Sequence, residues 1–411
     1  MPEKSNHSIA RGGEIMQKVE ILNGNKAAAI GAAMSRPGVV AAYPITPQTP
    51  VVEYFSEFAA NGEVDAAISE VESELTAMSV VTGASLAGSR TFTATASQGL
   101  ALMYEPYFRA STLRLPIVMA IVNREMISPQ SVWGGQQDSM SVRDAGWLQM
   151  YAEDNQEILD LIIQAFKIAE DKRVLLPINI CYDGFYLSHM TERVLIPEQE
   201  KVDAFLGSYK PEHIILDPEK PMAVDPLTNG VLVMEYRNKH LKAQQNALTV
   251  LDEVDKEYGR LFGREYGGAV EEYRMEDAEY ALVTTGSMSG AAKDAVDMQR
   301  EKGIKAGLVR MRMIRPFPKD RVCKALSRVK SFGVVDRNVS FGWDTGIVYQ
   351  EVKAALYDGD NKVPSVPIIG GLGGEDISVG MMMDSIDRVV KAAAEGKNSE
   401  CIWLMNEEEA K

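Results

Sequence analysis

The sequence predicts an α/β protein built on parallel sheets with helices on both faces. Short apolar runs alternate with helical patterns from about residue 19 to residue 180, and the alternation restarts at residue 280. Strands that are buried on both faces of a parallel sheet read as such runs. The length of 411 residues is enough for two or three domains, and 45% hydrophobic with 25% charged residues is an ordinary globular composition.

In the first alternating stretch, each expected strand is an apolar run and each expected helix follows a turn or a cap signal. The prolines from Pro44 to Pro50 exclude a helix directly after the second strand. Thr49 is a plausible N-cap with Pro50 at the first helical position. The expected order is strand 19–22, helix 25–34, strand 39–43, helix 51–60, strand 66–70, helix 75–87, and strands 90–94, 116–122 and 174–180.

The middle of the chain breaks this alternation. Residues 191–225 are rich in Pro, Glu and Lys with weak periodicity, which indicates a long surface excursion. A helix at 241–258 with exposed charges follows as a connector. The second stretch then runs through strand 280–284, helix 291–302, strand 305–310, a turn at 315–318, helix 319–329 and strand 331–336.

Charge and cysteine content exclude several classes of protein. The net charge of −15 argues against nucleic acid or an anionic membrane as a partner. No apolar run approaches the roughly 20 residues of a transmembrane helix, and the polar start lacks the apolar core of a signal peptide. Cys181, Cys323 and Cys401 are far apart, which predicts a reducing, cytoplasmic compartment and no four-cysteine cluster in this chain. The histidines show no metal-ligand spacing.

Several polar segments follow expected strands, at the edge of the sheet where ligands bind in open α/β folds. In Tyr43-Pro44-Ile45-Thr46-Pro47, the prolines would hold the Thr46 hydroxyl in place, although they could simply end the strand. In the segment 94–99, Thr95, Ser97 and Gln98 lead into a helix whose amides can approach a ligand.

Arginine 124 is the candidate for carboxylate binding. Asn123-Arg124 follows the strand 116–122, and a planar guanidinium matches two carboxylate oxygens. A surface ion pair is the alternative for Arg124. The next loop carries Trp133 and Gly134 and is long enough to be a lid.

Two further segments are acidic or glycine-rich. Glu70, Glu72 and Glu74 alternate before the helix 75–87, where acids can simply favour the helix dipole. Glu74 enters an apolar segment, so we expect it to be buried and suited to proton transfer, with Glu70 and Glu72 facing solvent. The run Gly370-Gly371-Leu372-Gly373-Gly374-Glu375-Asp376 lacks the Walker lysine and the Rossmann spacing, so a turn or a domain contact is expected.

Together these residues resemble the alpha subunit of the 2-oxoacid:ferredoxin oxidoreductases, the pyruvate:ferredoxin oxidoreductase family. The resemblance covers nearly the whole chain in family order. It rests on YPITP at 43–47, Glu72-Ser73-Glu74, TASQG at 95–99, Asn123-Arg124, Gln137-Asp138-Ser139, RDAGW at 143–147, Leu176-Pro177 with Asp183-Gly184, and RPFP at 315–318.

The resemblance implies a thiamine diphosphate enzyme with two domains. A thiamine pyrimidine-binding domain would occupy 19–255, with the surface excursion at about 191–240, after an N-terminal extension at 1–18. A transketolase C-terminal-like domain II would occupy 256–411.

The resemblance also assigns roles to residues. By motif match, Glu74 corresponds to the glutamate that hydrogen-bonds the aminopyrimidine ring, and Thr46 and Arg124 correspond to residues at the substrate carbonyl and carboxylate. The further cofactor contacts would be Tyr43, Pro44, Thr95, Ser97 and Gln98, and the further substrate contacts Trp133 and Gly134. No metal ligand is expected in this chain.

The implied reaction is the oxidative decarboxylation of a 2-oxoacid with coenzyme A, giving acyl-CoA, CO₂ and a reduced acceptor. The family's Gly-Asp-Gly motif for diphosphate and Mg²⁺ is absent, and so is a cysteine cluster. We therefore expect a beta subunit with the diphosphate–Mg²⁺ site and a cluster, together with gamma and ferredoxin-like (delta) subunits. The [4Fe-4S] clusters would lie on partner subunits only, and electrons would pass to ferredoxin or NAD through them.

Substrate and function leave alternatives. Thr46 favours a pyruvate-type acid, whereas Gly134-Gly135 would leave room for a larger group, such as the aryl ring of phenylglyoxylate against Trp133 and Met126. A beta-type subunit of the decarboxylating component of a lipoyl-linked dehydrogenase is one rival, and the YPITP and RDAGW motifs count against it. A non-catalytic structural subunit is the other, and the joint presence of Thr46, Glu74 and Arg124 counts against that one.

Overall fold

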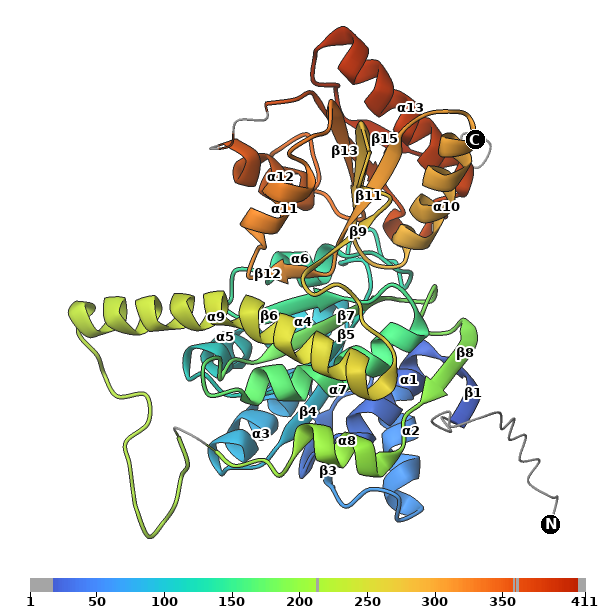
Figure 1. Cartoon of the computed structure of the whole chain (residues 1–411). Helices are drawn as coiled ribbons and strands as arrows, with labels where there is room; N and C mark the ends of the chain where they lie inside the picture. The colour runs from blue at the N-terminus through green and yellow to red at the C-terminus, as the bar shows by residue number, and fades with distance from the viewer. Residues whose placement is uncertain (1–17, 212–213, 358, 360–361, 406–411) are drawn as a thin grey trace, which may run out of the picture.

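A computed structural model describes residues 18–211, 214–357, 359 and 362–405. Within these residues the chain forms two α/β units stacked one on the other (Figure 1). The predicted α/β class with parallel sheets is therefore confirmed. The predicted N-terminal extension at 1–18 lies outside the described residues except for Lys18, which begins the first strand.

The first unit contains a seven-stranded sheet in the order β12-β6-β7-β5-β4-β2-β3. All neighbours are parallel except β12, which runs antiparallel to β6. Five of its strands lie on predicted ones, with β7 beginning four residues later than expected, and β6 and β12 are additional. The strands are β2 (Val39–Ala42), β3 (Ala67–Glu70), β4 (Thr91–Thr95), β5 (Val118–Asn123), β6 (Leu148–Tyr151), β7 (Ile178–Asp183) and β12 (Met313–Arg315).

Helices cover both faces of this sheet, which explains its unbroken apolar runs. Successive side chains of a strand point to opposite faces, so in β5 Val118, Ala120 and Val122 join one hydrophobic cluster, while Met119 and Ile121 join another. The helices are α1 (Gly24–Met34), α2 (Thr49–Ala60), α3 (Glu74–Leu86), α4 (Ser97–Leu102), α5 (Tyr104–Thr112), α6 (Gln137–Ser141) and α7 (Asn155–Glu170).

The predicted strand 19–22 lies outside the parallel sheet. It is β1 (Lys18–Asn23), which pairs antiparallel with β8 (Thr191–Ile196) in a separate two-stranded ribbon. The start of the expected surface excursion is therefore folded, and α8 (Gln199–Leu206) follows with Val202 and Phe205 in the core. Most residues between 207 and 229 are irregular and solvent-accessible.

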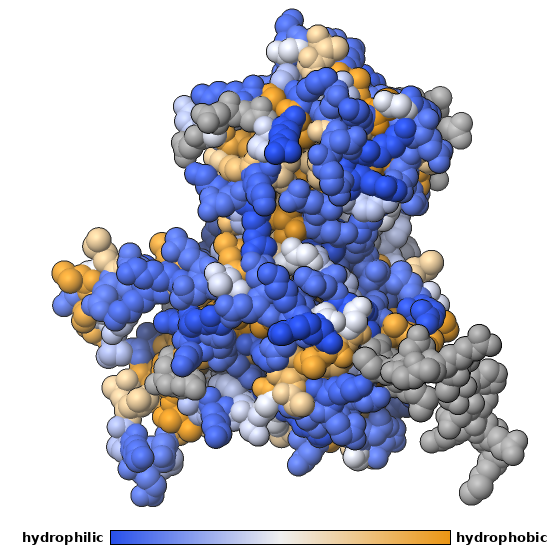
Figure 2. All heavy atoms as spheres, viewed as in Figure 1, coloured by the Kyte–Doolittle hydropathy of each residue, from blue (hydrophilic) through white to orange (hydrophobic). Residues whose placement is uncertain are grey.

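The helix expected at 241–258 is the middle of a longer helix, α9 (Gly230–Phe262). Asn229 caps its start by accepting from the Leu232 amide, and Gly263 ends it in a left-handed conformation. The C-terminal half packs on the first unit, whereas residues 230–239 are all exposed and project to the left in Figure 1. Figure 2 shows apolar side chains at that projecting end. Among the described residues, no helix is both long and apolar enough to cross a membrane.

The second unit has a six-stranded sheet in the order β15-β14-β13-β10-β11-β9, in which β9 is antiparallel. Helices α11 and α12 cover one face, and α10 and α13 cover the other (Figure 1). The strands are β9 (Val270–Tyr273), β10 (Tyr280–Thr284), β11 (Ala306–Met311), β13 (Ser331–Asp336), β14 (Ser365–Gly370) and β15 (Ile402–Leu404). The helices are α10 (Met288–Glu301), α11 (Lys319–Ala325), α12 (Ile347–Tyr357) and α13 (Val379–Glu395).

A buried ion cluster joins the two units. The carboxylate of Glu157 on α7 forms ion pairs with Arg310 at 2.6 Å and with Arg312 at 2.7 Å. All three side chains are at most 2% exposed. The two arginines hold the pKa of Glu157 at about 2 despite its burial. Immediately after them, β12 crosses into the first sheet, which explains why the chain does not divide into two separable halves at this point.

A second polar contact joins the units at the carboxyl end of β7. Asp183 accepts from the Ser287 amide at 2.9 Å and from the Ser287 hydroxyl at 2.7 Å, and it pairs with Arg337 at 3.3 Å. Gln136 donates to Asp183 at 3.1 Å and accepts from Thr285 at 2.9 Å. These contacts favour one orientation of the two units, since Asp183, Gln136, Thr285 and Arg337 are buried and Ser287 is partly buried.

Replacing Glu157 by Gln should destabilise the chain strongly, because buried Arg312 loses its close carboxylate and buried Arg310 keeps only Glu153 and Glu271. We expect the free energy of unfolding to fall by about 3 kcal/mol, seen as a lower thermal midpoint by circular dichroism. The matched control is Glu253→Gln, since Glu253 forms an exposed pair with Arg173 and its loss should leave the midpoint unchanged. Equal midpoints for the wild type and Glu157→Gln would contradict the role of this cluster.

Candidate active site

The sequence-predicted site residues gather at the carboxyl ends of β2, β4 and β5. Glu74 begins α3, with Ser73 as the N-cap, which accepts from the Thr76 amide at 3.2 Å. The side chain of Glu74 is 6% exposed because α3 buries Ala77 and Met78 just beyond it. The predicted burial of Glu74 is confirmed, and Glu70 and Glu72 face solvent as expected.

The Glu74 carboxylate lies against Thr95 and Gly99. A Cβ added to Gly99 would stand 2.5 Å from Thr95 Oγ1 and 2.6 Å from Glu74 Oε1. Thr95 Oγ1 is buried without a hydrogen-bond partner. Among the residues that the structure describes, no hydrogen bond or ion pair reaches the Glu74 carboxylate either. Within the described residues, two adjacent polar groups on buried side chains are thus without a hydrogen-bond partner.

Arg124 is held at the same edge by main-chain carbonyls. Its side chain is 6% exposed, with Nη1 donating to the Thr46 carbonyl at 3.0 Å and Nε to the Ser131 carbonyl at 2.9 Å. Within the described part of the chain Arg124 forms no ion pair, so the surface-salt-bridge alternative does not apply there. Burial lowers the pKa of this guanidinium, which favours binding of an anion that replaces the lost solvation.

Thr46 stands beside Arg124 on an exposed loop. Tyr43, Pro44 and Thr46 are all exposed, whereas Pro47 is buried and its carbonyl accepts from Asn25 at 2.8 Å. The Thr46 hydroxyl is therefore presented to solvent from an anchored loop. This arrangement agrees with the geometry expected from the prolines.

Asp138 organises the site, a role that its motif alone did not predict. Its buried carboxylate accepts from Ser97 N and Arg124 N at 3.0 Å, from Asn123 Nδ2 at 2.8 Å and from Ser139 N at 2.7 Å. Burial raises the pKa of Asp138 to about 6, and the four donors oppose that rise. The signal that could have identified it is a lone acid after a polar lid loop.

The hydroxyl of Ser97 is engaged within the chain. Ser97 has a φ of +45° at the start of α4, and its Oγ donates to the Glu125 carbonyl at 2.6 Å. The neighbouring Gln98 side chain also contacts Ser97 Oγ and is half-buried. Thr95 is thus the residue of this segment whose hydroxyl stays without a partner.

The substrate contact predicted for Gly134 stays a prediction, whereas the space expected there is occupied by the chain. A Cβ there would lie 2.6 Å from the Gly184 carbonyl, and at Gly135 it would collide with the Glu125 carboxyl. The space that these glycines leave is therefore filled by the chain itself and does not enlarge a substrate pocket. Trp133 is 51% exposed and lies 4.4 Å from the Phe185 ring, so it is available at the surface of the loop.

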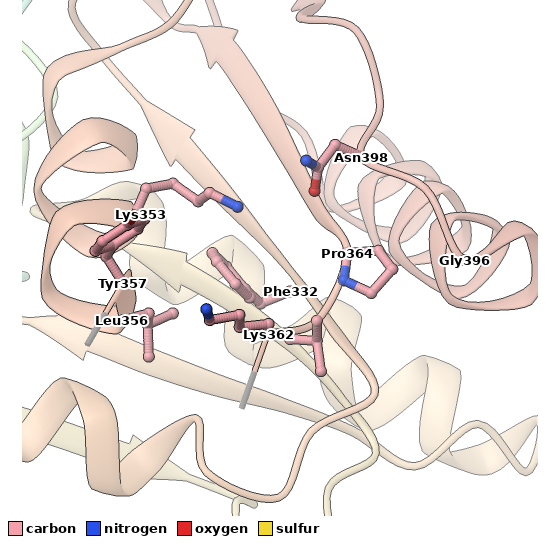
Figure 3. A pocket seen from close by; sticks show the side chains of 9 residues that line it. Phe332, Lys353, Leu356, Tyr357, Lys362, Pro364, Gly396 and Asn398 are labelled. Carbon is pink, nitrogen blue, oxygen red and sulfur yellow. The ribbon is translucent and has the colours of Figure 1, made fainter. Parts of the chain in front are cut away.

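The second unit carries a separate cavity that is not part of this site. It has a volume of about 320 Å³ and opens where β13 and β14 begin, lined by Lys353 and Lys362 among others (Figure 3). Lys353 donates to Ser365 Oγ at 3.1 Å. In the described ranges, no group of three or more His, Cys, Asp or Glu side chains is placed to hold a metal ion.

Comparisons with known proteins agree with this architecture. Residues 30–256 match the family model described as pyruvate flavodoxin/ferredoxin oxidoreductase, thiamine diphosphate-binding, and residues 278–382 match pyruvate:ferredoxin oxidoreductase core domain II. The chain is 48% identical to the alpha subunit of NADH-dependent phenylglyoxylate dehydrogenase from Aromatoleum evansii, over 94% of this chain and 95% of that one. It is 46% identical to pyruvate synthase subunit PorA from Pyrococcus abyssi, over 93% and 97% of the two chains.

Solved structures show the same fold at low identity. A 2-oxoglutarate:ferredoxin oxidoreductase from Magnetococcus marinus superposes with a TM-score of 0.70 and 20% identity, over 92% of this chain and 66% of that one. A split-gene transketolase superposes with a TM-score of 0.55 and 12% identity, over 90% and 97%. At these identities the likeness concerns the fold alone.

Replacing Asp138 by Asn should disturb the site and lower stability. The amide NH₂ would face two backbone N–H donors that now share one carboxylate oxygen, which costs about 2 kcal/mol or more. We expect a lower thermal midpoint, with Asp384→Asn as the control because Asp384 is exposed on α13. A midpoint equal to that of the control would show that Asp138 does not hold the strand ends together.

Proposed function

The chain belongs to the pyruvate:ferredoxin oxidoreductase family as an alpha-type subunit of a 2-oxoacid oxidoreductase, and we propose that it supplies half of a thiamine diphosphate active site. The observation that carries this proposal is the buried Glu74 carboxylate beside Thr95 Oγ1, both without partners among the described residues. The proposed reaction converts a 2-oxoacid and coenzyme A to acyl-CoA, CO₂ and a reduced acceptor.

The residues present fit the pyrimidine side of the cofactor. Glu74 offers a hydrogen-bond acceptor and Thr95 a hydroxyl without a partner, and the absence of a side chain at Gly99 lets both groups approach its backbone closely. When bound, thiamine diphosphate supplies the nucleophilic carbon and the electron sink for decarboxylation. The role of Glu74 is to hold a proton between its Oε atom and a ring nitrogen, which the low polarity around it strengthens.

Arg124 and Thr46 would bind the substrate. The guanidinium is already oriented by two carbonyl groups and carries no carboxylate from the described chain, so a substrate carboxylate can pair with it. Thr46, whose main chain contacts Arg124, would place its hydroxyl near the 2-oxo oxygen. Such preorientation lowers the entropic cost of reaching the reactive geometry. Trp133 would contact the substrate side chain from the loop surface.

The substrate class that Arg124 and Thr46 favour is a 2-oxoacid with one carboxylate. The relatives named above act on phenylglyoxylate or are pyruvate synthases, at nearly equal identity. Because the chain itself fills the space at Gly134 and Gly135, any selection for an aryl group would come from Trp133.

Partner subunits would complete the active site. Near the site residues in sequence, apolar side chains are exposed at Tyr43, Leu75, Leu102 and Tyr104, and we call these four the rim. We assign this rim to a beta subunit that holds the diphosphate, Mg²⁺ and a cluster. Gamma and ferredoxin-like subunits would carry further [4Fe-4S] clusters and pass electrons to ferredoxin or NAD. The relatives are likewise named as subunits.

We also infer the domain division from these observations. The pyrimidine-binding domain would end near residue 255 within α9, and domain II would follow at 256–411. The return of β12 to the first sheet makes the two domains share an edge.

Replacing Glu74 by Gln should abolish turnover of the complex while leaving its assembly intact. We expect kcat to fall at least about 100-fold, because a glutamine cannot hold the proton that the Glu74 carboxylate would share with the ring nitrogen. The measurement is 2-oxoacid- and CoA-dependent reduction of a dye by the purified complex, with size-exclusion chromatography to check assembly. Glu72→Gln is the matched control, since Glu72 is exposed two residues away. Unchanged turnover in Glu74→Gln would refute the assignment.

Substrate preference can be measured on the same complex. A comparison of kcat/KM for pyruvate, phenylglyoxylate and 2-oxoglutarate should favour an acid with one carboxylate, because Arg124 is the cation at the strand ends that pairs with none of the described acids. Trp133→Ala should lower kcat/KM for phenylglyoxylate more than for pyruvate. A preference for 2-oxoglutarate would overturn the substrate class.

A further inference from the structure

The glycine-rich segment 370–376 of the second unit reaches the loop that carries Arg124. Gly374 N donates to the Gly134 carbonyl at 2.7 Å, and Gly373 N lies 3.3 Å from Glu125 Oε1. Beyond them, the Tyr186 hydroxyl donates to Asp376 at 3.2 Å. The amides that would cradle a phosphate are thus directed at the chain itself, and the expected domain contact is what the structure shows.

The glycines are required by this close approach. Gly371, Gly373 and Gly374 have φ values of +72°, +63° and +76° in the left-handed region. A Cβ at Gly371 would stand 2.6 Å from Arg337 Nε, and one at Gly374 would stand 2.7 Å from Trp133 Cβ. At Gly373 the nearest atom to a Cβ would be 3.8 Å away. Contact with the loop between β5 and α6 (residues 124–136, the lid loop) therefore depends on Gly374 in particular.

The lid loop links the contact made by Gly374 to the Arg124 guanidinium. Glu125 N donates to the Trp133 carbonyl at 3.1 Å, which closes the loop at its base. Inside the closed loop, the Ser131 carbonyl accepts from Arg124 Nε at 2.9 Å. The Glu125 carbonyl is fixed in turn by Ser97 Oγ at 2.6 Å. A displacement of the loop would therefore change the direction in which Arg124 points.

We propose that Glu125 and the 371–376 segment form a clamp through which the second unit positions Arg124 for the 2-oxoacid carboxylate. The proposal rests on the substrate role given to Arg124 above. Glu125, Gly373 and Gly374 are positioning residues, because they act through Gly134 and Ser131. The clamp gives domain II a direct part in substrate affinity from a place outside the cofactor half-site.

The charge around Glu125 makes the clamp sensitive to pH. Glu125 faces Asp138 of α6 and Arg337, and burial raises the pKa of Glu125 to about 7. An ionised carboxylate is the stronger acceptor for the Gly373 amide. The KM for the 2-oxoacid should therefore rise as the pH falls through about 7, and Glu125→Gln should remove this part of the pH profile.

The test uses the purified complex and steady-state kinetics with pyruvate or the best 2-oxoacid. Gly374→Ala and Glu125→Ala should each raise KM about tenfold while kcat changes less than about twofold, as for a loss of orientation in binding. Glu125→Gln keeps an acceptor oxygen, so its KM at pH 8 should stay closer to the wild type. Gly396→Ala is the strain control, because Gly396 also has a positive φ, +65°, with nothing within 4 Å of an added Cβ.

The Arg124→Lys variant distinguishes a failure of the clamp from a failure of the substrate role of Arg124. If Arg124→Lys raises KM while Gly374→Ala and Glu125→Ala behave like Gly396→Ala, the clamp is wrong and the substrate role of Arg124 stands. If Arg124→Lys leaves KM unchanged, the substrate role itself fails. A fall in kcat with unchanged KM in the two clamp variants would also overturn the clamp. Glu125→Ala introduces no positive-φ strain, so its kinetics remain informative should Gly374→Ala fold poorly.

Discussion

The buried Asp138 carboxylate is the interaction on which the arrangement of the site depends. A charge that is removed from water needs several donors, and Asp138 obtains them from the ends of β4 and β5 and from the start of α6. Because Ser97 N and Arg124 N share one oxygen, the loop after β4 and the loop after β5 cannot move independently. The segment that holds Thr95 and Gly99 is thereby kept in register with the segment that holds Arg124.

The same principle joins the two units. Asp183 binds Ser287 and Arg337 of the second unit, and Glu157 forms ion pairs with Arg310 and Arg312. Each acid sits on an element of the first sheet or its covering helix, while its partners come from more than 100 residues later. Buried acids of this kind are strongly destabilising once a partner is lost. The angle between the units is therefore specified, and the glycine segment 371–376 can meet the lid loop at hydrogen-bonding distance.

Local patterns in the sequence were sufficient for the parts of the fold that local patterns determine. The fully buried strand β5 is visible as an apolar run, and the burial of Glu74 follows from the apolar residues after it. Helix α7 is buried almost all round, yet it contains Glu157, Asp160 and Gln164, which resemble a solvent-facing stripe. The ion-pair partners of the two acids, Arg310 and Arg312 for Glu157 and Arg264 for Asp160 at 2.5 Å, lie far away in sequence. For the same reason neither β12 in the first sheet nor Gly184 against Gly134 could be foreseen.

The buried acids named above divide into two kinds, and this division supports the proposed cofactor half-site. Asp138, Asp183 and Glu157 are buried and supplied with several donors by the chain itself. Glu74 is nearly as buried, yet within the described residues it has no donor, and its neighbour Thr95 Oγ1 is also unpaired. A buried polar group without a partner is costly, and natural chains rarely retain two side by side. Because the chain supplies donors to Asp138, Asp183 and Glu157, we propose that Glu74 and Thr95 find their hydrogen-bond partners on a bound molecule, at a face that a partner subunit would cover.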